Sequence, residues 1–226
     1  AASGSDSGRE CTLNDNSMDT ELHEQRNERR RIKVIDCATQ LFRSKGVREV
    51  TMDDIAGALR ISKRTLYQMF RGKEELVLAC VKAEVEADRR RRIEIENDTD
   101  DALERLFRNI EYKLVDLRNA HSDYAKDIRR YASVRTFTAA CREDLLGAIR
   151  NILQLGCAQG TIRPDIHFEQ TTQGLLYLVD GVAEYGQFAD FSVLDFVFNV
   201  LLVYIRGCAT DKGRASIDEF IKKHHF

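Results

Sequence analysis

Hydrophobic residues recur every three to four positions along most of the chain, with polar and charged residues filling the gaps. This period is typical of amphipathic helices, and alternating β-branched runs bounded by turn residues, which would mark strands, are absent from the sequence. One Pro and thirteen Gly in 226 residues leave long stretches free of helix breakers. The pattern therefore predicts an all-α protein.

The pattern divides the chain into a polar leader and a series of helices. Residues 1–20 are rich in Ser, Gly, Asp and Asn, and we expect them to form a disordered leader. The longer helices are expected at 21–44, 73–94, 99–119, 122–132, 134–159, 168–188 and 190–208, followed by a loosely packed amphipathic tail from residue 210.

Two short helical patterns stand back to back at residues 51–76, which read TMDDIAGALRISKRTLYQMFRGKEEL. Thr51 is the expected N-cap of the first helix, and Ser62 is the expected N-cap of the second. Ser62 follows Leu59 by only three positions, so the connection must be a tight turn. Helix, short turn and helix in this order are typical of a helix-turn-helix.

The second short helix has one apolar and one polar face. Leu66 and Phe70 are four residues apart and are expected to point inward. The residues left on the outer face are Lys63, Arg64, Thr65, Tyr67 and Gln68. A basic, hydroxyl-rich face on the second helix suits contact with DNA.

The charge distribution agrees with this interpretation. The whole chain carries a formal net charge of −2, yet residues 24–75 hold thirteen Lys and Arg against eight Asp and Glu, a net of +5. A basic block beside a helix-turn-helix is the expected footprint of nucleic-acid contact. The run Arg26, Arg29, Arg30, Arg31 and Lys33 fits either a solvated face or contact with phosphates. A second run, Arg89 to Arg92, is interpreted as solvated.

The 51–76 segment resembles the DNA-binding segment of the tetracycline-repressor (TetR) family of bacterial transcriptional regulators. The matching residues are Thr51, Ile55, Ala56, Ile61, Ser62, Thr65, Leu66, Tyr67, Phe70, Lys73, Glu74, Glu75 and Leu76. Arg60 departs from the Gly that is usual in the family's turn, and Met69 departs from a His or aromatic residue.

This resemblance implies an N-terminal three-helix helix-turn-helix head at 21–75 and a C-terminal helical bundle at 76–226 for effector binding and dimerisation. It implies a sequence-specific regulator, most simply a repressor that a small-molecule ligand releases from a palindromic double-stranded DNA operator. The alternative is a regulator of the same fold that a protein partner controls. The expected DNA-binding residues are Thr51, Lys63, Arg64, Thr65, Tyr67, Gln68 and Lys73.

The last long helical pattern, at 190–208, is apolar nearly all round and must be covered on more than one side. Burial against a second copy of the chain is the economical solution, and the resembled family dimerises through its last two main helices. We therefore expect a homodimer. The expected interface residues are Gly174, Leu178, Gly181, Phe196, Val200 and Tyr204.

By the same resemblance, a ligand pocket is expected among the helices from Thr99 to Phe188. Its candidate lining residues are Phe107, Glu111, Tyr112, Tyr131, Phe137, Cys141 and Tyr177. Aromatic and Cys residues at helical spacing also suit a plain hydrophobic core, which is the commoner arrangement.

Other function classes find little support in the sequence. It contains no Gly-rich phosphate loop, nucleophile elbow or His/Cys metal spacing, so we expect no enzyme activity, cofactor or metal site. A purely structural bundle would not need the basic face. The six Cys residues lack paired spacing and fit buried thiols, and no secretory signal or 18-residue apolar span is present. These features predict a cytoplasmic protein without a membrane segment.

Overall fold

The structure, a computed structural model, describes residues 11–121, 123–184 and 193–224. Its regular elements are helices, and one isolated antiparallel β-bridge pairs Ile162 with Ala209. The helices of the N-terminal half are α1 (Cys11–Lys45), α2 (Met52–Leu59), α3 (Lys63–Met69), α4 (Lys73–Asp98) and α5 (Ala102–Arg118). Those of the C-terminal half are α6 (Tyr124–Ile128), α7 (Ala132–Ala140), α8 (Arg142–Ala158), α9 (Phe168–Glu184), α10 (Val193–Phe196), the π-helix η1 (Val197–Leu201), α11 (Leu202–Cys208) and α12 (Asp211–His224). The expected all-α fold is confirmed.

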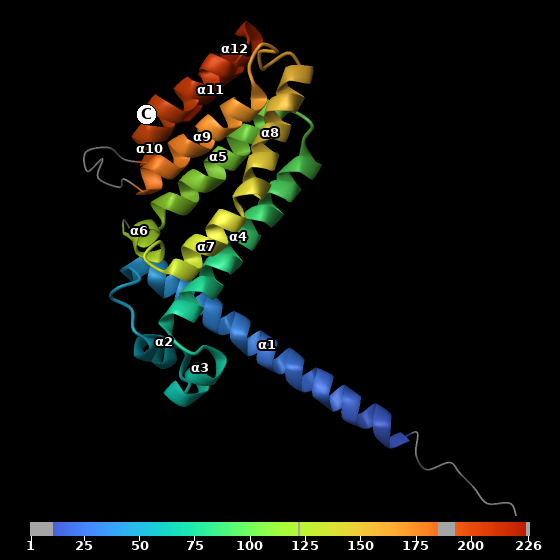
Figure 1. Ribbon diagram of the computed structural model, residues 1–226, viewed down its shortest axis with the longest axis vertical. Coiled ribbons are helices and arrows are strands. Elements are labelled where there is room, and N and C mark those ends of the chain that lie inside the picture. The colour runs from blue at the N-terminus through green and yellow to red at the C-terminus, as the bar shows by residue number, and fades with distance from the viewer. Residues whose placement is uncertain (1–10, 122, 185–192, 225–226) are drawn as a thin grey trace, which may run out of the picture.

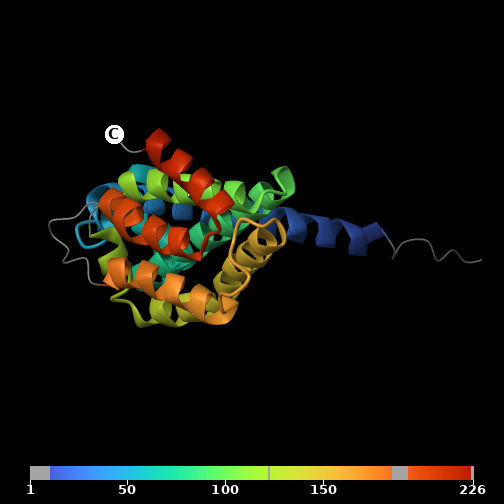
Figure 2. The same ribbon diagram turned by 90° about the horizontal axis from the view of Figure 1, so that it is seen from above.

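The helices form a small head and a longer bundle (Figure 1). Helices α2 and α3 lie at one end of the molecule, and α12 lies towards the other. Helix α4 runs from the head into the bundle, beside α5, α7 and α8. Seen from above, the N-terminal part of α1 stands out from the bundle (Figure 2).

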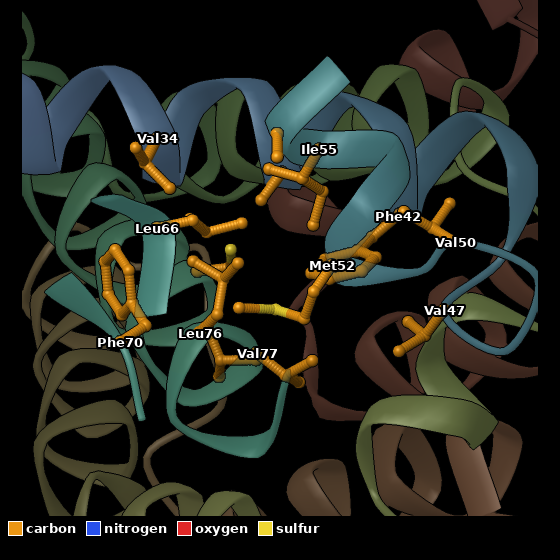
Figure 3. Close-up of a cluster of buried hydrophobic side chains, with 14 of the residues drawn as sticks. Val34, Phe42, Val47, Val50, Met52, Ile55, Leu66, Phe70, Leu76 and Val77 are labelled. Atoms are coloured by element: carbon orange, nitrogen blue, oxygen red, sulfur yellow. The ribbon is translucent and has the colours of Figure 1, made fainter. Parts of the chain in front are cut away.

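The head is held together by apolar side chains from four helices (Figure 3). Phe42 of α1, Ile55 of α2, Leu66 of α3 and Leu76 of α4 are all 0% exposed. Because each helix contributes a side chain that the others cover, burial of this cluster holds the two short helices that would not persist alone. The cluster also includes Tyr124 and Val134, so the head packs directly on the α6–α7 region.

A second cluster lies in the bundle, between α5, α8, α9, the η1–α11 segment and α12. Leu202 and Ile217 are both 0% exposed, and Phe107 stacks on Phe220 with 4.2 Å between the ring centroids. The tail is therefore packed rather than loose: α12 covers one side of this core.

Several other boundaries differ from the expected ones. Helix α4 continues to Asp98 rather than ending at 94, and α6 covers only Tyr124–Ile128 of the expected 122–132 helix. Helix α1 begins at Cys11, within the segment expected to be a disordered leader. Residues 11–20 contain no Gly or Pro, so nothing in them ends the helix, and adding residues to an existing helix costs less free energy than starting a new one.

The expected helix at 134–159 divides at Cys141 into α7 and α8. Three residues before this break, the Thr138 hydroxyl donates to the Val134 carbonyl at 3.0 Å and so competes with the backbone hydrogen bonds of the helix. Helix α5 begins at Ala102 rather than at the expected residue 99, and Asp101 caps it by accepting the Glu104 N–H at 2.8 Å.

Candidate nucleic-acid interface

Helix α2 begins with a reciprocal cap, as the sequence predicts. The Thr51 hydroxyl accepts the Asp54 N–H at 3.2 Å, and the Asp54 carboxylate accepts the Thr51 N–H at 2.8 Å. The Thr51 hydroxyl also donates to Asp54 Oδ2 at 2.6 Å. Hydrogen bonds from Thr51 hold the pKa of the Asp54 carboxyl below its usual value. The cap fixes where α2 starts, and it engages the Thr51 hydroxyl that was expected to contact DNA.

The turn between α2 and α3 depends on Arg60. Its backbone is left-handed, with φ 54° and ψ 39°, and its N–H bonds the Gly57 carbonyl at 3.1 Å. The next N–H, of Ile61, bonds the Ala56 carbonyl at 3.0 Å. The turn thus closes the α2 C-terminus in the way a Gly usually does. The Arg60 side chain is exposed.

Helix α3 divides its side chains between the core and the surface. Ser62 caps it by accepting the Thr65 N–H at 3.0 Å. Leu66 is 0% exposed, whereas Tyr67 is 49% exposed. Arg64 and Gln68 are also exposed, so three of the expected DNA-binding side chains share the outer surface of the helix.

The other expected DNA-binding residues already have partners within the chain. Lys63 Nζ forms an ion pair with Asp53, and the Thr65 hydroxyl lies 2.8 Å from the Ser62 hydroxyl. Lys73 Nζ donates to the Arg48 carbonyl at 3.3 Å. Burial lowers the pKa of Lys73, and nearby carboxylates oppose that shift. The outer face is therefore divided between exposed groups that point into solvent and groups that would exchange a protein partner for a phosphate.

Arg31 plays a part that the sequence did not distinguish from the rest of its basic run. Its guanidinium lies 4.2 Å from the centroid of the Phe70 ring and donates to the Met69 carbonyl at the C-terminus of α3. It also pairs with Glu75 at 3.6 Å. Arg31 thereby ties the end of α3 to α1 and α4.

A second unpredicted group joins the head to the bundle. Arg43 Nη1 donates to Glu84 Oε1 at 3.0 Å, and Arg43 Nη2 donates to Asp116 Oδ1 at 2.7 Å. The Tyr124 hydroxyl donates to Glu84 Oε2 at 2.7 Å. Burial raises the pKa of the Glu84 carboxyl, although the bonds from Tyr124 and Arg43 oppose that rise. These residues are far apart in sequence, and no local motif marks them.

Beside this group, Arg48 Nε lies 3.1 Å from the carboxylate of Asp127, which is only 3% exposed. This ion pair links the loop before α2 to α6. The orientation of the head is thus fixed by charged contacts as well as by the hydrophobic cluster.

Three of the seven candidate pocket residues belong to the two clusters, and the other four lie outside them. Tyr131 and Phe137 pack against the head cluster, and Phe107 packs in the bundle cluster. Arg91 lies over the Tyr112 ring, 6.0 Å from its centroid. Tyr177, 64% exposed, lines an open groove of about 370 Å³ with Glu169, Gln170, Gln173 and Gly174. Glu111 and Cys141 are half-buried, so the seven do not surround one common space.

The candidate dimer residues lie on α9 and on the α10–η1–α11 segment. Val200 is 39% exposed, and its neighbour Val203, an apolar residue of the same segment, is 59% exposed. Phe196 and Leu178 are half-buried. Gly174 and Tyr204 contact one another within the chain, because a Cβ at Gly174 would lie 2.7 Å from the Tyr204 hydroxyl. The side-chain position of Gly181 lies outside the described residues.

Within the described ranges, no three His, Cys, Asp or Glu side chains gather in a way that suits a metal ion. In the same ranges no helix combines the length and apolarity needed to cross a membrane.

The capped two-helix unit, its buried cluster and the exposed face of α3 define a helix-turn-helix DNA-binding regulator. Residues 34–80 match the family described as bacterial regulatory proteins, tetR family. The helix-turn-helix head of this chain therefore has the DNA-binding domain of the tetR family, whose members are generally DNA-binding proteins without enzyme activity. A comparison with curated protein sequences found no match.

Solved structures share the fold over most of the chain. A TetR-family transcriptional regulator from Marinobacter aquaeolei VT8 superposes with a TM-score of 0.64 at 19% identity, covering 85% of this chain and 97% of that chain. A transcriptional regulator from Saccharomonospora viridis in complex with choline superposes with a TM-score of 0.61 at 22% identity, covering 88% of this chain and 97% of that chain. A ketosteroid transcriptional regulator of Mycobacterium tuberculosis superposes with a TM-score of 0.53 at 18% identity, covering 80% of this chain and 96% of that chain.

Proposed function

We propose that this protein is a homodimeric repressor that binds a palindromic operator through α3 and leaves it when a small molecule binds the bundle. In this proposal residues 21–75 are the DNA-binding domain, and residues 76–226 bind the effector and form the dimer. The observation that carries it is the division of α3 between the buried Leu66 and the exposed Arg64, Tyr67 and Gln68.

On DNA, α3 would enter the major groove. Arg64 lies in the first turn of α3, where recognition helices meet base edges, and an Arg can bind a guanine through two hydrogen bonds. Gln68, one turn later, has the donor and acceptor that an adenine requires. Thr51, Lys63, Thr65, Tyr67 and Lys73 would bind phosphates, which fix position rather than sequence.

Dimerisation would place two α3 helices about one or more DNA turns apart, as a palindromic operator requires. The exposed apolar side chains Tyr177, Val200 and Val203 on α9, η1 and α11 supply a surface that a second copy would cover. The interface would also use Leu178 and Gly181 of α9 and Phe196 of α10.

The ligand response is the second part of the proposal. One structural relative is described in complex with choline and another as a ketosteroid regulator, and those names describe those proteins. Any effector must bind the DNA-competent and DNA-incompetent states with different affinities. The alternative, regulation of the same fold by a protein partner, has no observation in its favour beyond the DNA-binding head that both share, so the small-molecule response is the one proposed.

Selection of bound sequences from a random duplex library tests the DNA-binding part. We expect an imperfect palindrome from the wild-type protein and a loss of preference at defined positions from Arg64→Ala. The matched control, Arg90→Ala, changes an exposed Arg of α4 in the bundle and should select the same sequence. Failure of the wild-type protein to enrich any sequence would refute the proposal.

A thermal-stability screen against small metabolites then separates the two modes of regulation. A ligand that binds the native state raises the melting temperature, because it draws the equilibrium towards the folded protein. An effector should also weaken operator binding by the factor that DNA weakens effector binding.

A further inference from the structure

The N-terminal part of α1 extends beyond the rest of the head. The helix has 35 residues, and Figure 1 shows its first half running out past α3 without another helix beside it. Residues 24–30 are all exposed. Among the α1 side chains that the structure describes, from residue 24 on, Arg31 is the first to contact α3, at its C-terminus, so the extension starts next to the recognition helix.

The exposed stretch is charged on one side. Arg26, Arg29, Arg30 and Lys33 are spaced i, i+3, i+4 and i+7, which places them on one helical face. Glu24 and Glu28 lie four residues apart and about half a turn away from that face, so they do not neutralise it. The result is a stripe of four cations, which we call the α1 basic stripe.

The α1 basic stripe differs from the other cationic runs of the molecule. None of its four side chains has an ion pair or hydrogen bond with another side chain in the part of the chain that the structure describes. In the bundle, by contrast, several arginines are paired: Arg108 lies 2.8 Å from Asp98, Arg150 lies 2.7 Å from Glu169 and Arg206 lies 2.7 Å from Asp218. Arg89 and Arg92 share Asp144 in the same way, at 3.6 Å and 3.8 Å.

Leaving such a stripe unpartnered is unfavourable. Like charges four residues apart on a helix repel one another, and a helix without tertiary contacts is marginal in water. A polyanion along the stripe would remove the repulsion and stabilise the helix. The stripe lies at the α3 end of the molecule, so the polyanion that its position fits is the DNA that α3 would read (Figure 1).

We propose that the α1 basic stripe binds the phosphate backbone of the operator outside the half-site that α3 reads. This inference rests on the proposed function and extends its footprint. The eight residues from Arg26 to Lys33 span about 12 Å at 1.5 Å per residue. At about 3.4 Å per base pair, the stripe corresponds to roughly three or four flanking base pairs on each side of the operator.

The test replaces the four cations with Gln (Arg26→Gln, Arg29→Gln, Arg30→Gln and Lys33→Gln), which is about as favourable in a helix as Arg or Lys. Arg31 is kept because it holds α3. The control replaces four exposed cations of the bundle helices α4 and α12 with Gln (Arg89, Arg90, Lys222 and Lys223), so both variants lose the same formal charge. Binding to the selected operator is titrated against salt, and circular dichroism verifies the helix content.

The plot of log affinity against log salt should become less steep by about two to four units in the stripe variant and by less than about one unit in the control. Adding about four flanking base pairs to a minimal operator should strengthen binding by the wild-type protein and leave the stripe variant unchanged.

The outcomes separate this inference from the proposed function. If the wild-type protein selects no sequence, the proposed function itself fails. If it selects an operator but the stripe variant keeps the wild-type slope and length dependence, the stripe does not bind DNA and this inference is overturned. A stripe reserved for an acidic protein or an anionic membrane surface would give that second result.

Discussion

The hydroxyl of Tyr204 lies over Gly174, where a Cβ would come within 2.7 Å of the phenol oxygen. The same hydroxyl donates to the Thr171 carbonyl at 3.2 Å, and burial raises its pKa. The small residue at 174 therefore lets a neighbouring helix of the same chain approach α9. This gives Gly174 a reason to be Gly that does not involve a second subunit.

Gly174→Ala should accordingly destabilise the fold. The added methyl group must displace the Tyr204 ring, and such overpacking costs about 1–3 kcal/mol of unfolding free energy, measured by urea denaturation. The loss should be smaller when Tyr204→Phe is also present, because the atom that clashes has been removed. If the two substitutions change the free energy of unfolding additively, with no coupling between them, the Tyr204 ring does not contact residue 174.

Arg60→Gly should stabilise the protein by up to about 1 kcal/mol, because Gly accepts the left-handed backbone that Arg60 adopts at φ 54°. Arg60→Val should be destabilising, since a β-branched side chain is strained in that conformation. Urea denaturation measures both. If Arg60 also touches a phosphate, Arg60→Gly will flatten the salt dependence of DNA binding by about one unit, and an unchanged slope would limit Arg60 to its role in the turn.

The parts of the molecule that the sequence predicted well are those in which local rules decide the structure. Thr51 and Ser62 are capping residues directly before short amphipathic patterns, and they cap α2 and α3 as expected. Leu66 and Phe70 are spaced for one helical face and are buried. Local sequence and tertiary packing agree at these positions, so the residues alone suffice to predict the helix-turn-helix.

The remaining features depend on contacts between distant residues. Arg31 lies in a basic run with four similar neighbours, and its distinct role follows only from the position of Phe70. Arg43, Glu84 and Tyr124 come from three helices, and no spacing relates them. The division of α7 from α8 at Cys141 occurs without Gly or Pro, so the hydrophobic period runs through it.

The pH dependence of stability should report on Glu84. Burial raises its pKa in the folded protein, so the native state binds more protons than the unfolded state between the ordinary Glu pKa and the raised one. The free energy of unfolding should therefore fall as the pH rises through this window. Glu84→Gln should remove this component, which urea denaturation at a series of pH values would detect. If the free energy of unfolding of the Gln variant falls with pH as steeply as that of the wild-type protein, groups other than Glu84 cause the pH dependence.

Tyr124→Phe should shift that window upward. The Tyr124 hydroxyl donates to Glu84 and lowers its pKa, so the carboxyl of the variant should titrate at a higher pH. Loss of this bond to a buried carboxylate should also cost about 1–3 kcal/mol in the free energy of unfolding. Carboxyl carbon chemical shifts of Glu84 measure the pKa directly. An unshifted titration would show that the hydroxyl does not support the charged form.

Lys73→Ala should flatten the salt dependence of operator binding by about one unit if Lys73 exchanges the Arg48 carbonyl for a phosphate. Lys82→Ala is the matched control, because Lys82 is an exposed Lys on the same helix. Equal slopes for the two variants would remove Lys73 from the DNA contacts and leave it as a bond between α4 and the loop before α2.

Val203→Asp should weaken the proposed homodimer. Val203 is 59% exposed on α11, beside Val200, and burying a carboxylate in an apolar interface is costly unless a partner charge is present. We expect the dimer dissociation constant, measured by analytical ultracentrifugation, to rise at least about tenfold, which corresponds to about 1.4 kcal/mol. Val115→Asp provides the control, because Val115 of α5 is 58% exposed and belongs to none of the segments proposed for the interface. Both variants place an acid at a similarly exposed Val, so a difference between them isolates the surface that the second subunit covers. Dissociation constants that shift equally, or not at all, would move the interface away from α11.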